Sequence, residues 1–455
     1  MPSKIINAPP KQLMQINIKN FPIVRFYSIV WNALFHGQKL FLQRLAGTLL
    51  MIFLINLIFG CSKKRGIANQ PSQQFFQDVT TKYLPTSKFP LQGVTFARVD
   101  RNRGSDLVWF VPTPSKGTKI KVLINKGSSG IGREKGDSKV KQIPGNIRSL
   151  AKGDIDRDGV DDLVLITAHQ KTESAKILFN NGKGYFYSRF ELKLPSIRKG
   201  IKNIDLFDLD LDGDVDFLFT GRKLLEENGK INRRQGQVFI NIGGGQFKDE
   251  TNLLWPELPS GIMSTSIADY NQDGYLDVFL VYGNSQNRLL INNGVGKFFD
   301  KTDLLLPKII DKSTHADWAD FDLDGDNDLL VTNKAIAKRY LSYSDETCYF
   351  LENDGSGRFV KKSNKILPGV PAYRVYVLDA NGTGIPDIII LTENGVRYLV
   401  GEEKWGYSME TKKRFPKTSH VREMTFGDIN GDGFLDILGL VGKNNNPKLW
   451  LNRVK

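Results

Sequence analysis

Residues 208–216 have the sequence DLDLDGDVD, and this stretch decides the fold because the chain repeats it. The pattern D-x-[DN]-x-D-G-x-x-D recurs at 154–162, 269–277, 320–328 and 428–436. A sixth copy, 379–387, has Thr383 at its fifth position, and a seventh, Asp100–Asp106, is two residues shorter. Successive copies start 49 to 61 residues apart, a period typical of one propeller blade with variable loops.

Each acidic loop is followed at once by a short apolar run, such as FLFT (217–220) and IIIL (388–391). Such runs between turn residues indicate buried strands and not helices. Further along each repeat come a strand, a glycine-rich turn and an aromatic residue, as in ILFNNGKGYF (177–186) and LLINNGVGKF (289–298). Asn-Gly suits tight hairpins because their central residues need positive φ, so each repeat predicts an antiparallel sheet.

The two ends of the repeat region complement each other. The last repeat stops at LWLN (449–452) and lacks the glycine turn and the aromatic residue. Phe75–Thr80 (FFQDVT) has the missing part, because it resembles FKDET (247–251) and FFDKT (298–302), which follow the glycine turns elsewhere. We therefore predict an all-β fold, a seven-bladed β-propeller of four-stranded antiparallel blades whose N-terminal strand closes the last blade. This closure removes two exposed sheet edges.

The acidic loops have the composition of cation sites. Four carboxylate or amide side chains within nine residues repel one another unless a cation lies between them. All donors are oxygen atoms and the intact loops hold no His or Cys, so a hard cation such as Ca²⁺ is expected instead of zinc or copper. Positions 1, 3, 5 and 9 would supply side chains, position 7 a carbonyl oxygen, and the glycine at position 6 the bend.

We predict five structural Ca²⁺ sites and a possible sixth in the Thr383 loop. The predicted ligands are Asp154, Asp156, Asp158, Val160 and Asp162; Asp208, Asp210, Asp212, Asp214 and Asp216; Asp269, Asn271, Asp273, Tyr275 and Asp277; Asp320, Asp322, Asp324, Asp326 and Asp328; Asp428, Asn430, Asp432, Phe434 and Asp436; and, in the sixth loop, Asp379, Asn381, Thr383 and Asp387. The alternative is an Asp- and Gly-rich turn without metal, an alternative that carries most weight for the Asp100 loop. An EF-hand is rejected because it needs Glu at position 12, where these loops have Leu165, Phe219, Leu280, Val331 and Gly439.

These motifs resemble the FG-GAP repeats of the integrin α-subunit head and the related VCBS repeats of secreted bacterial proteins. The segment HADWADFD (315–322) is especially similar to the bacterial form. The resemblance covers roughly residues 75–452 and implies a seven-bladed β-propeller with Ca²⁺ loops. It implies no single function, because the fold hosts adhesion, glycan binding and occasional enzymes.

Residues 1–61 predict an export signal. The run LAGTLLMIFLINLIFG (45–60) follows Lys39 and Arg44, carries no charge and ends at Cys61, which is typical of a signal peptide. The end of the run, IFGC (58–61), resembles the lipobox of bacterial lipoproteins. The resemblance implies lipid attachment at Cys61, with an uncleaved signal anchor as the alternative. We expect residues 62–74 to be a flexible tether and residues 75–455 to form the propeller.

The net charge of +14 does not indicate a nucleic-acid partner, because nine Lys or Arg residues and no Asp or Glu lie in the first 65 residues. An acylated Cys61 would leave Cys348 as the other cysteine of the chain, so no intramolecular disulfide is expected. The chain also lacks G-x-S-x-G, H-E-x-x-H and P-loop motifs. We therefore expect no enzymatic activity.

We expect an exported, monomeric binding or adhesion scaffold at the cell envelope, as an outer-membrane or surface lipoprotein. Its partner would be an envelope protein or a glycan bound to a loop face. The alternatives are a polysaccharide-active enzyme or its carbohydrate-binding module, and an envelope assembly factor without an extracellular ligand. The basic segments 128–142 and 222–236 are predicted to be long hairpin loops, either simply solvated or part of a surface for acidic polysaccharide.

Overall fold

The computed structural model divides the chain into two units, Met1–Pro71 and Ser72–Lys455. The structure describes residues 75–454, apart from 85–90, 92, 103, 114–116, 127–130, 136–142, 170–171, 190, 222–224, 228–229, 233–234, 335–347, 363–366, 368–370 and 419. The predicted export signal, Cys61 and the tether 62–74 lie outside the described residues. Within the described part of the chain, no helix has the length and apolar character needed to cross a membrane.

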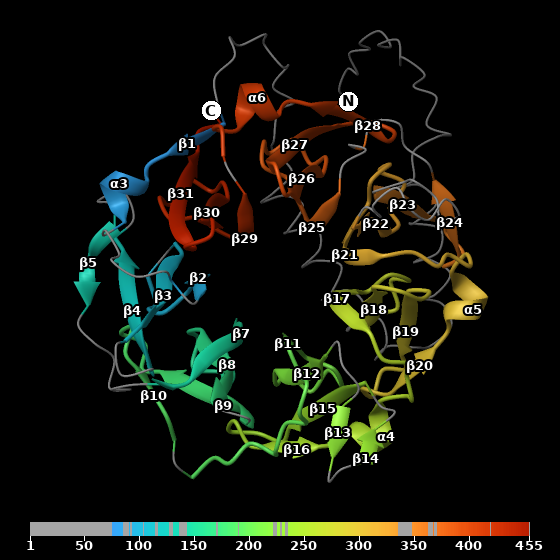
Figure 1. Ribbon diagram of the computed structural model, residues 1–455, viewed down its shortest axis with the longest axis horizontal. Coiled ribbons are helices and arrows are strands. Elements are labelled where there is room, and N and C mark those ends of the chain that lie inside the picture. The colour runs from blue at the N-terminus through green and yellow to red at the C-terminus, as the bar shows by residue number, and fades with distance from the viewer. Residues whose placement is uncertain are drawn as a thin grey trace, which may run out of the picture. The chain divides into compact units, whose positions relative to one another are not determined.

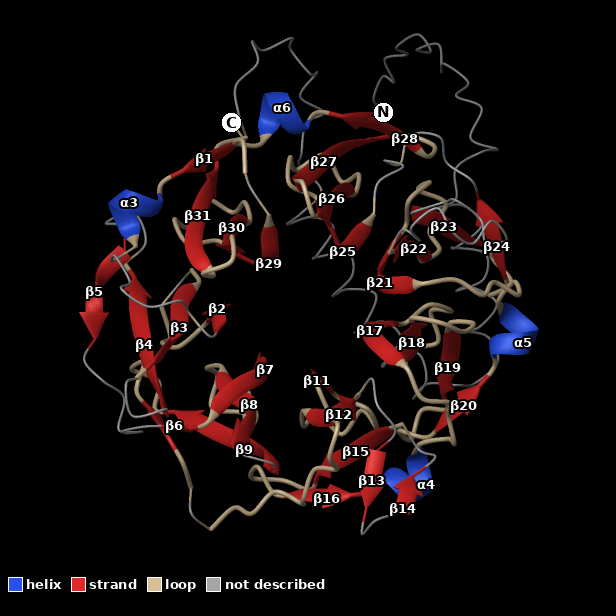
Figure 2. Cartoon of the chain, in the orientation of Figure 1, coloured by secondary structure: helices blue, strands red, loops and turns tan. Residues whose placement is uncertain are grey.

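Seven small antiparallel sheets are arranged in a ring, which Figures 1 and 2 show in the same view. The prediction of a seven-bladed β-propeller is therefore confirmed. Blades 1 to 3 consist of β2 (Gly93–Ala97), β3 (Asp106–Pro112), β4 (Gly117–Asn125) and β5 (Ile131–Lys135); β7 (Asn146–Gly153), β8 (Asp162–His169), β9 (Thr172–Asn180) and β10 (Phe186–Tyr187); and β11 (Asn203–Phe207), β12 (Asp216–Thr220), β15 (Gly236–Asn241) and β16 (Phe247–Asp249).

The other blades follow the same order from the inner strand to the outer strand (Figure 1). Blades 4 to 7 consist of β17 (Ile262–Ala268), β18 (Asp277–Tyr282), β19 (Arg288–Asn292) and β20 (Phe298–Asp300); β21 (Ser313–Ala319), β22 (Asp328–Asn333), β23 (Cys348–Asn353) and β24 (Phe359–Lys362); β25 (Ala372–Leu378), β26 (Asp387–Thr392), β27 (Gly395–Glu402) and β28 (Gly406–Met409); and β29 (Val421–Gly427), β30 (Asp436–Val441), β31 (Asn446–Asn452) and β1 (Phe76–Asp78).

The N-terminal strand closes the ring, as the two ends of the repeat region predicted. Strand β1 pairs antiparallel with β31, with Phe76 opposite Asn452 and Asp78 opposite Trp450. Backbone hydrogen bonds extend this pairing, since Arg453 N donates to Phe75 O over 2.6 Å. Blade 7 thus combines both ends of the repeat region, and β1 covers the outer edge of β31.

A short sequence signal, Asp-x-Thr, ends the outer strand in several blades. In blade 7, Asp78 Oδ1 accepts hydrogen bonds from the backbone N and the hydroxyl of Thr80, and Thr80 Oγ1 accepts one from Leu449 N. This threonine starts a helix of one turn at α3 (Thr80–Tyr83), α4 (Thr251–Leu254) and α5 (Thr302–Leu305). The described helix α6 (Thr411–Arg414) also starts at a threonine, but Met409 lies where the other corners have Asp. The recurrence of the corner explains why FFQDVT resembles the segments after the other glycine turns.

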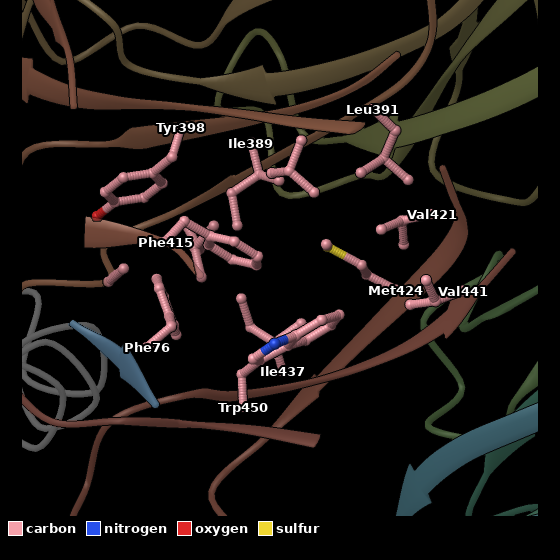
Figure 3. Close-up of a cluster of buried hydrophobic side chains, with 13 residues drawn as sticks. Phe76, Ile389, Leu391, Tyr398, Phe415, Val421, Met424, Ile437, Val441 and Trp450 are labelled. Carbon is pink, nitrogen blue, oxygen red and sulfur yellow. The ribbon is translucent and has the colours of Figure 1, made fainter. Parts of the chain in front are cut away.

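The hydrophobic core is divided into seven clusters, each between two neighbouring blades. Figure 3 shows the cluster between blades 6 and 7, where Phe76, Phe415 and Trp450 pack beside Ile389 and Ile437. In the second strand of blade 6, Ile389 and Leu391 face blade 7, whereas Ile388 and Ile390 face blade 5. The strands after the acidic loops are therefore apolar throughout, because both faces of each are buried.

Two additions interrupt the regular pattern. Within segment 222–236, β13 (Leu225–Glu227) and β14 (Lys230–Asn232) pair as a hairpin between β12 and β15, as predicted. Segment 128–142 was predicted to be a long loop, but this was wrong for residues 131–135. They form β5, which pairs with β4 and is the outer strand of blade 1. A further short strand, β6 (Ile143–Pro144), also pairs with β4.

Candidate metal centres

Each acidic loop joins the first and second strands of its blade and bends twice through left-handed backbone. The glycines at position 6 of the intact loops have φ between 87° and 102°, which confirms the predicted bend: Gly159, Gly213, Gly274, Gly325 and Gly433. Position 4 is also left-handed, with φ of 59° at Leu211 and 66° at Leu323. This second bend was missed, although Gly382 and Gly431 at position 4 of two loops were a signal for it.

The first carboxylate of each loop organises the turn around itself. Asp154 Oδ1 accepts a hydrogen bond from Asp158 N, and Asp154 Oδ2 accepts one from Gly159 N, both over 2.9 Å. The position-6 glycine donates to the position-1 carboxylate in all six longer loops, with distances of 2.7–3.0 Å. The position-1 carboxylate therefore holds the turn through backbone N–H groups of its own loop.

The last carboxylate of each loop links the loop to the sheet. Asp216 is fully buried, and its two oxygens accept hydrogen bonds from Leu209 N and Asn241 N, both over 2.8 Å. A backbone N–H at or next to the end of the third strand also donates to Asp106, Asp162, Asp277, Asp328, Asp387 and Asp436. The position-2 N–H donates to Asp162, Asp328, Asp387 and Asp436, and at Asp106 the second donor is Val99, which directly precedes the shorter loop. Each oxygen keeps a further lone pair for a cation.

The asparagine that ends the third strand then ties neighbouring blades together. Asn241 Nδ2 donates to Ile155 O in the loop of blade 2, over 3.2 Å, and Asn292 Nδ2 donates to Leu209 O in the loop of blade 3, over 2.8 Å. Asn180, Asn353 and Asn452 make the equivalent bond to the preceding blade. Sequence reasoning assigned these asparagines only to the hairpin turn, so their role between blades was missed.

Three loops bring three carboxylates together in a group that could hold a metal ion. The groups are Asp154, Asp156 and Asp162; Asp208, Asp210 and Asp216; and Asp320, Asp322 and Asp328, and within each group the oxygens lie within 4.8 Å of one another. These are positions 1, 3 and 9. The position-5 carboxylates instead accept the N–H of position 7, as between Asp158 and Val160 and between Asp212 and Asp214.

Two properties of these groups fit a hard cation. Each group has one buried carboxylate oxygen with no hydrogen-bond partner among the described residues: Asp156 Oδ1, Asp208 Oδ1 and Asp322 Oδ1. An isolated buried anionic oxygen is costly, and a cation bound to it removes the cost. Burial, with the neighbouring carboxylates adding to it, also raises the pKa of Asp162, Asp216 and Asp328 to about 7.

The remaining loops differ from these three. Position 3 is an asparagine in three of them, and Asn271 Nδ2 and Asn430 Nδ2 donate to the position-5 carboxylates Asp273 and Asp432, each over 2.9 Å. In the sixth loop the hydroxyl of Thr383 donates to Asn381 Oδ1 over 2.6 Å. Among positions 1, 3, 5 and 9, loops 269–277 and 428–436 thus have one carboxylate fewer than the three groups, and loop 379–387 has two fewer.

The short seventh loop keeps the link to the sheet and loses the carboxylate group. Asp106 is buried and bonded like every other position-9 residue. Asp100 uses its two oxygens to accept hydrogen bonds from the backbone and the side chain of Asn102. A pocket of about 360 Å³ lies there, lined by Asp100, Arg101, Asn102, Asn181, Gly182 and Lys183. The acidic loop of blade 1 and the glycine turn of blade 2 thus form one pocket; the face of the propeller that carries these loops and turns is called the loop face below.

The fold and these turns define a closed β-propeller with Asp-rich loops that fit cations. An FG-GAP-like repeat family model matches residues 154–219, 229–280, 269–331 and 379–439, which together span about half of the chain. The chain therefore belongs to the FG-GAP-like repeat family. This fold is generally a non-enzymatic binding scaffold, in agreement with the expectation that the chain is not an enzyme.

Solved structures share the fold at low sequence identity. A lectin of Agrocybe aegerita, described by its specific recognition of non-reducing terminal N-acetylglucosamine, is 19% identical, with a TM-score of 0.51 over 72% of this chain and 82% of the lectin chain. BBS1N, in a complex with ARL6DN, is 9% identical, with a TM-score of 0.51 over 84% of this chain and 98% of that chain. A comparison with curated proteins gave no match.

Proposed function

We propose that this chain is an exported calcium-binding β-propeller that acts as a binding scaffold at the cell envelope and recognises a protein or a glycan through its loop face. One observation carries the proposal: three acidic loops each bring three carboxylates together, and each of these groups contains a buried oxygen without a partner, which points to a cation. The preference for calcium follows from the all-oxygen donor set and its irregular spacing.

A bound cation would neutralise the repulsion between the carboxylates of a loop. The chain's own residues do the rest: the position-1 carboxylate holds the turn, and the position-9 carboxylate fixes the turn to its sheet. The asparagine that ends the third strand then joins its blade to the acidic loop of the preceding blade. A loop face held in this way is rigid before a partner arrives, so little conformational entropy is lost on binding.

The pocket beside Lys183 is the candidate contact point for the partner on this face. Asp100, Asn102 and Lys183 line it, and such side chains can form hydrogen bonds with hydroxyl or carboxylate groups of a glycan. The Agrocybe aegerita lectin shows that this fold can recognise a sugar. It shares only the fold with this chain, so its sugar is one probe among others.

A pull-down from envelope extract with the full-length chain, with calcium or with chelator, tests the proposal. We expect a protein or a glycan to be retained with calcium and released by chelator, and a glycan array with calcium present separates the two kinds of partner. Lys183→Ala should weaken retention, whereas Lys308→Ala, at an exposed position away from the pocket, should not. Equal recovery in calcium and in chelator would contradict a calcium-dependent scaffold.

A further inference from the structure

The three carboxylate groups have the same donors but different surroundings. Loops 208–216 (DLDLDGDVD) and 320–328 (DFDLDGDND) are identical at positions 1, 3, 4, 5, 6, 7 and 9. Positions 2 and 8, where the two loops differ, supply no predicted ligand, so we look for a difference in cation affinity in the charged residues that reach the loops from outside.

The preceding loop contributes a cation in one case and a neutral amide in the other. Arg157, at position 4 of the loop before 208–216, donates from Nη2 to Asp212 O over 2.7 Å. Its guanidinium also lies 2.8 Å from Asp214 Oδ1 and 3.9 Å from Asp212 Oδ1. Gln272, at position 4 of the loop before 320–328, instead donates to Gly325 O and Asp326 Oδ1. Both residues are left-handed, with φ of 59° and 57°, so they occupy equivalent places.

The position-3 carboxylates of loops 154–162 and 320–328 show a similar contrast between a charged and a neutral neighbour. Arg189 forms an ion pair with Asp156 Oδ2 and packs 3.9 Å above the ring centre of Phe179. The indole Nε1 of Trp405 donates to Asp322 Oδ2 over 2.8 Å. In both cases the other oxygen, Asp156 Oδ1 or Asp322 Oδ1, is buried without a partner. One oxygen is thus fixed by a neighbour and the other is left for a cation, but only Arg189 brings a positive charge.

A lysine near Trp405 does not change the net charge around loop 320–328. Lys362 Nζ lies 4.7 Å from the Trp405 ring centre, but it forms an ion pair with Glu352, so the pair adds no net charge. Loop 154–162 has a second guanidinium, because Arg101 donates to Asp158 O over 3.1 Å. Of the three carboxylate groups, the one in loop 320–328 is therefore the group whose described donors from other loops, Gln272 and Trp405, are both neutral.

We propose that the three groups are unequal cation sites and that loop 320–328 binds calcium most tightly, with Trp405 and Gln272 as its positioning residues. The guanidinium groups at loops 154–162 and 208–216 weaken binding there by repulsion. This ranking rests on the proposed calcium-binding function. A unit positive charge a few ångströms beyond the ligands of a divalent cation changes its affinity on the order of ten-fold at a partly hydrated site.

Isothermal titration of the full-length chain with calcium, after chelation, tests the ranking. We expect Asp322→Asn to remove the tightest step and Asp210→Asn to leave it unchanged. Both changes suit the fold, because Asn271 and Asn430 already occupy position 3 in other loops. Gln272→Arg should weaken the tightest step about ten-fold, and Arg157→Gln should tighten a weaker step by a similar factor. Both effects should shrink in concentrated salt.

The outcomes separate the two proposals. If the chain takes up no calcium at all, both the proposed function and the ranking are wrong. If calcium binds but the tightest step survives Asp322→Asn, or neither exchange of charge moves any affinity, the ranking is wrong and the calcium-binding function stands. Trp405→Phe keeps the ring and removes the indole N–H, so an unchanged tightest step in that variant would contradict the role assigned to Trp405.

Discussion

The position-9 carboxylates allow the contribution of a cation to be separated from that of the fold. Asp216 and Asp106 are both fully buried, and each accepts two backbone hydrogen bonds. Asp216 belongs to a group of three carboxylates, whereas Asp106 belongs to the loop whose first carboxylate is occupied by Asn102. Changing each to alanine therefore removes the same bonds but a cation ligand in one case only.

The expected losses follow from these contacts. Each variant leaves two buried N–H groups without an acceptor, at about 1–3 kcal/mol for each group. Part of this is offset because the buried carboxylate is itself destabilised, which raises the pKa to about 6 for Asp106 and about 7 for Asp216. A site with a Kd near 0.1 mM in about 1 mM calcium adds roughly 1.4 kcal/mol to stability. When calcium is present, Asp216→Ala should therefore lose this binding contribution in addition to the loss from the two hydrogen bonds, whereas in chelator it should show only the loss from the hydrogen bonds.

Denaturant unfolding of the two variants and the parent chain, in 1 mM calcium and in chelator, measures these quantities. We expect the loss for Asp216→Ala to be about 1.4 kcal/mol larger in calcium than in chelator, and the loss for Asp106→Ala to be equal in both. If the two variants depend on calcium to the same extent, the carboxylate group around Asp216 holds no cation and the reasoning is refuted.

Three further predictions concern pH, ring closure and backbone strain. Burial raises the folded-state pKa of Asp277 and Asp436 from 3.8 to about 7, so the calcium-free folded state binds more protons than the unfolded chain. Its stability should fall as the pH rises from about 4 to 7, whereas calcium affinity should rise, and unfolding at pH 5.5 and 8 in chelator and in calcium checks both trends. Phe76→Ala should lower the free energy of unfolding by about 3–5 kcal/mol because this fully buried ring packs against Tyr398 and Phe415, whereas Phe299→Ala, at a position that is 43% exposed, should change it far less. Leu211→Gly should stabilise the chain by about 1 kcal/mol in thermal unfolding, because leucine is strained at φ 59° and its side chain is 52% exposed. A loss of stability in this variant would mean that a contact of the Leu211 side chain outweighs the backbone strain.

The propeller could be predicted from sequence because its signals are local and repeated. Seven copies of one pattern fix the number of blades, and the likeness of FFQDVT to FFDKT fixes the closing strand, since both contain the Asp-x-Thr corner. One copy of either signal would have been weak. The glycine at position 6 was equally predictable, because few other residues tolerate that backbone.

Contacts between blades could not be predicted, because they join residues far apart in the sequence. Asn292 and Leu209 are 83 positions apart, and nothing near either residue shows that the amide of one meets the carbonyl of the other. Trp405 and Asp322 are likewise 83 positions apart. The segment 131–135 was misjudged for a different reason: its Gly, Arg, Glu and Lys residues suggest a loop, but pairing with β4 outweighs their weak strand preference.

The closing strand has a consequence for the order in which the molecule is completed. Asp78 and Lys448 meet in blade 7 although 370 positions separate them. During synthesis the segment containing Phe76 emerges among the first described residues, and its partner β31 is the last of the propeller strands to emerge. Six sheets can assemble before that point, but the seventh waits for β31. Until then the molecule is an open arc with an unpaired edge, and a chain cut short before β31 would stay in that aggregation-prone state.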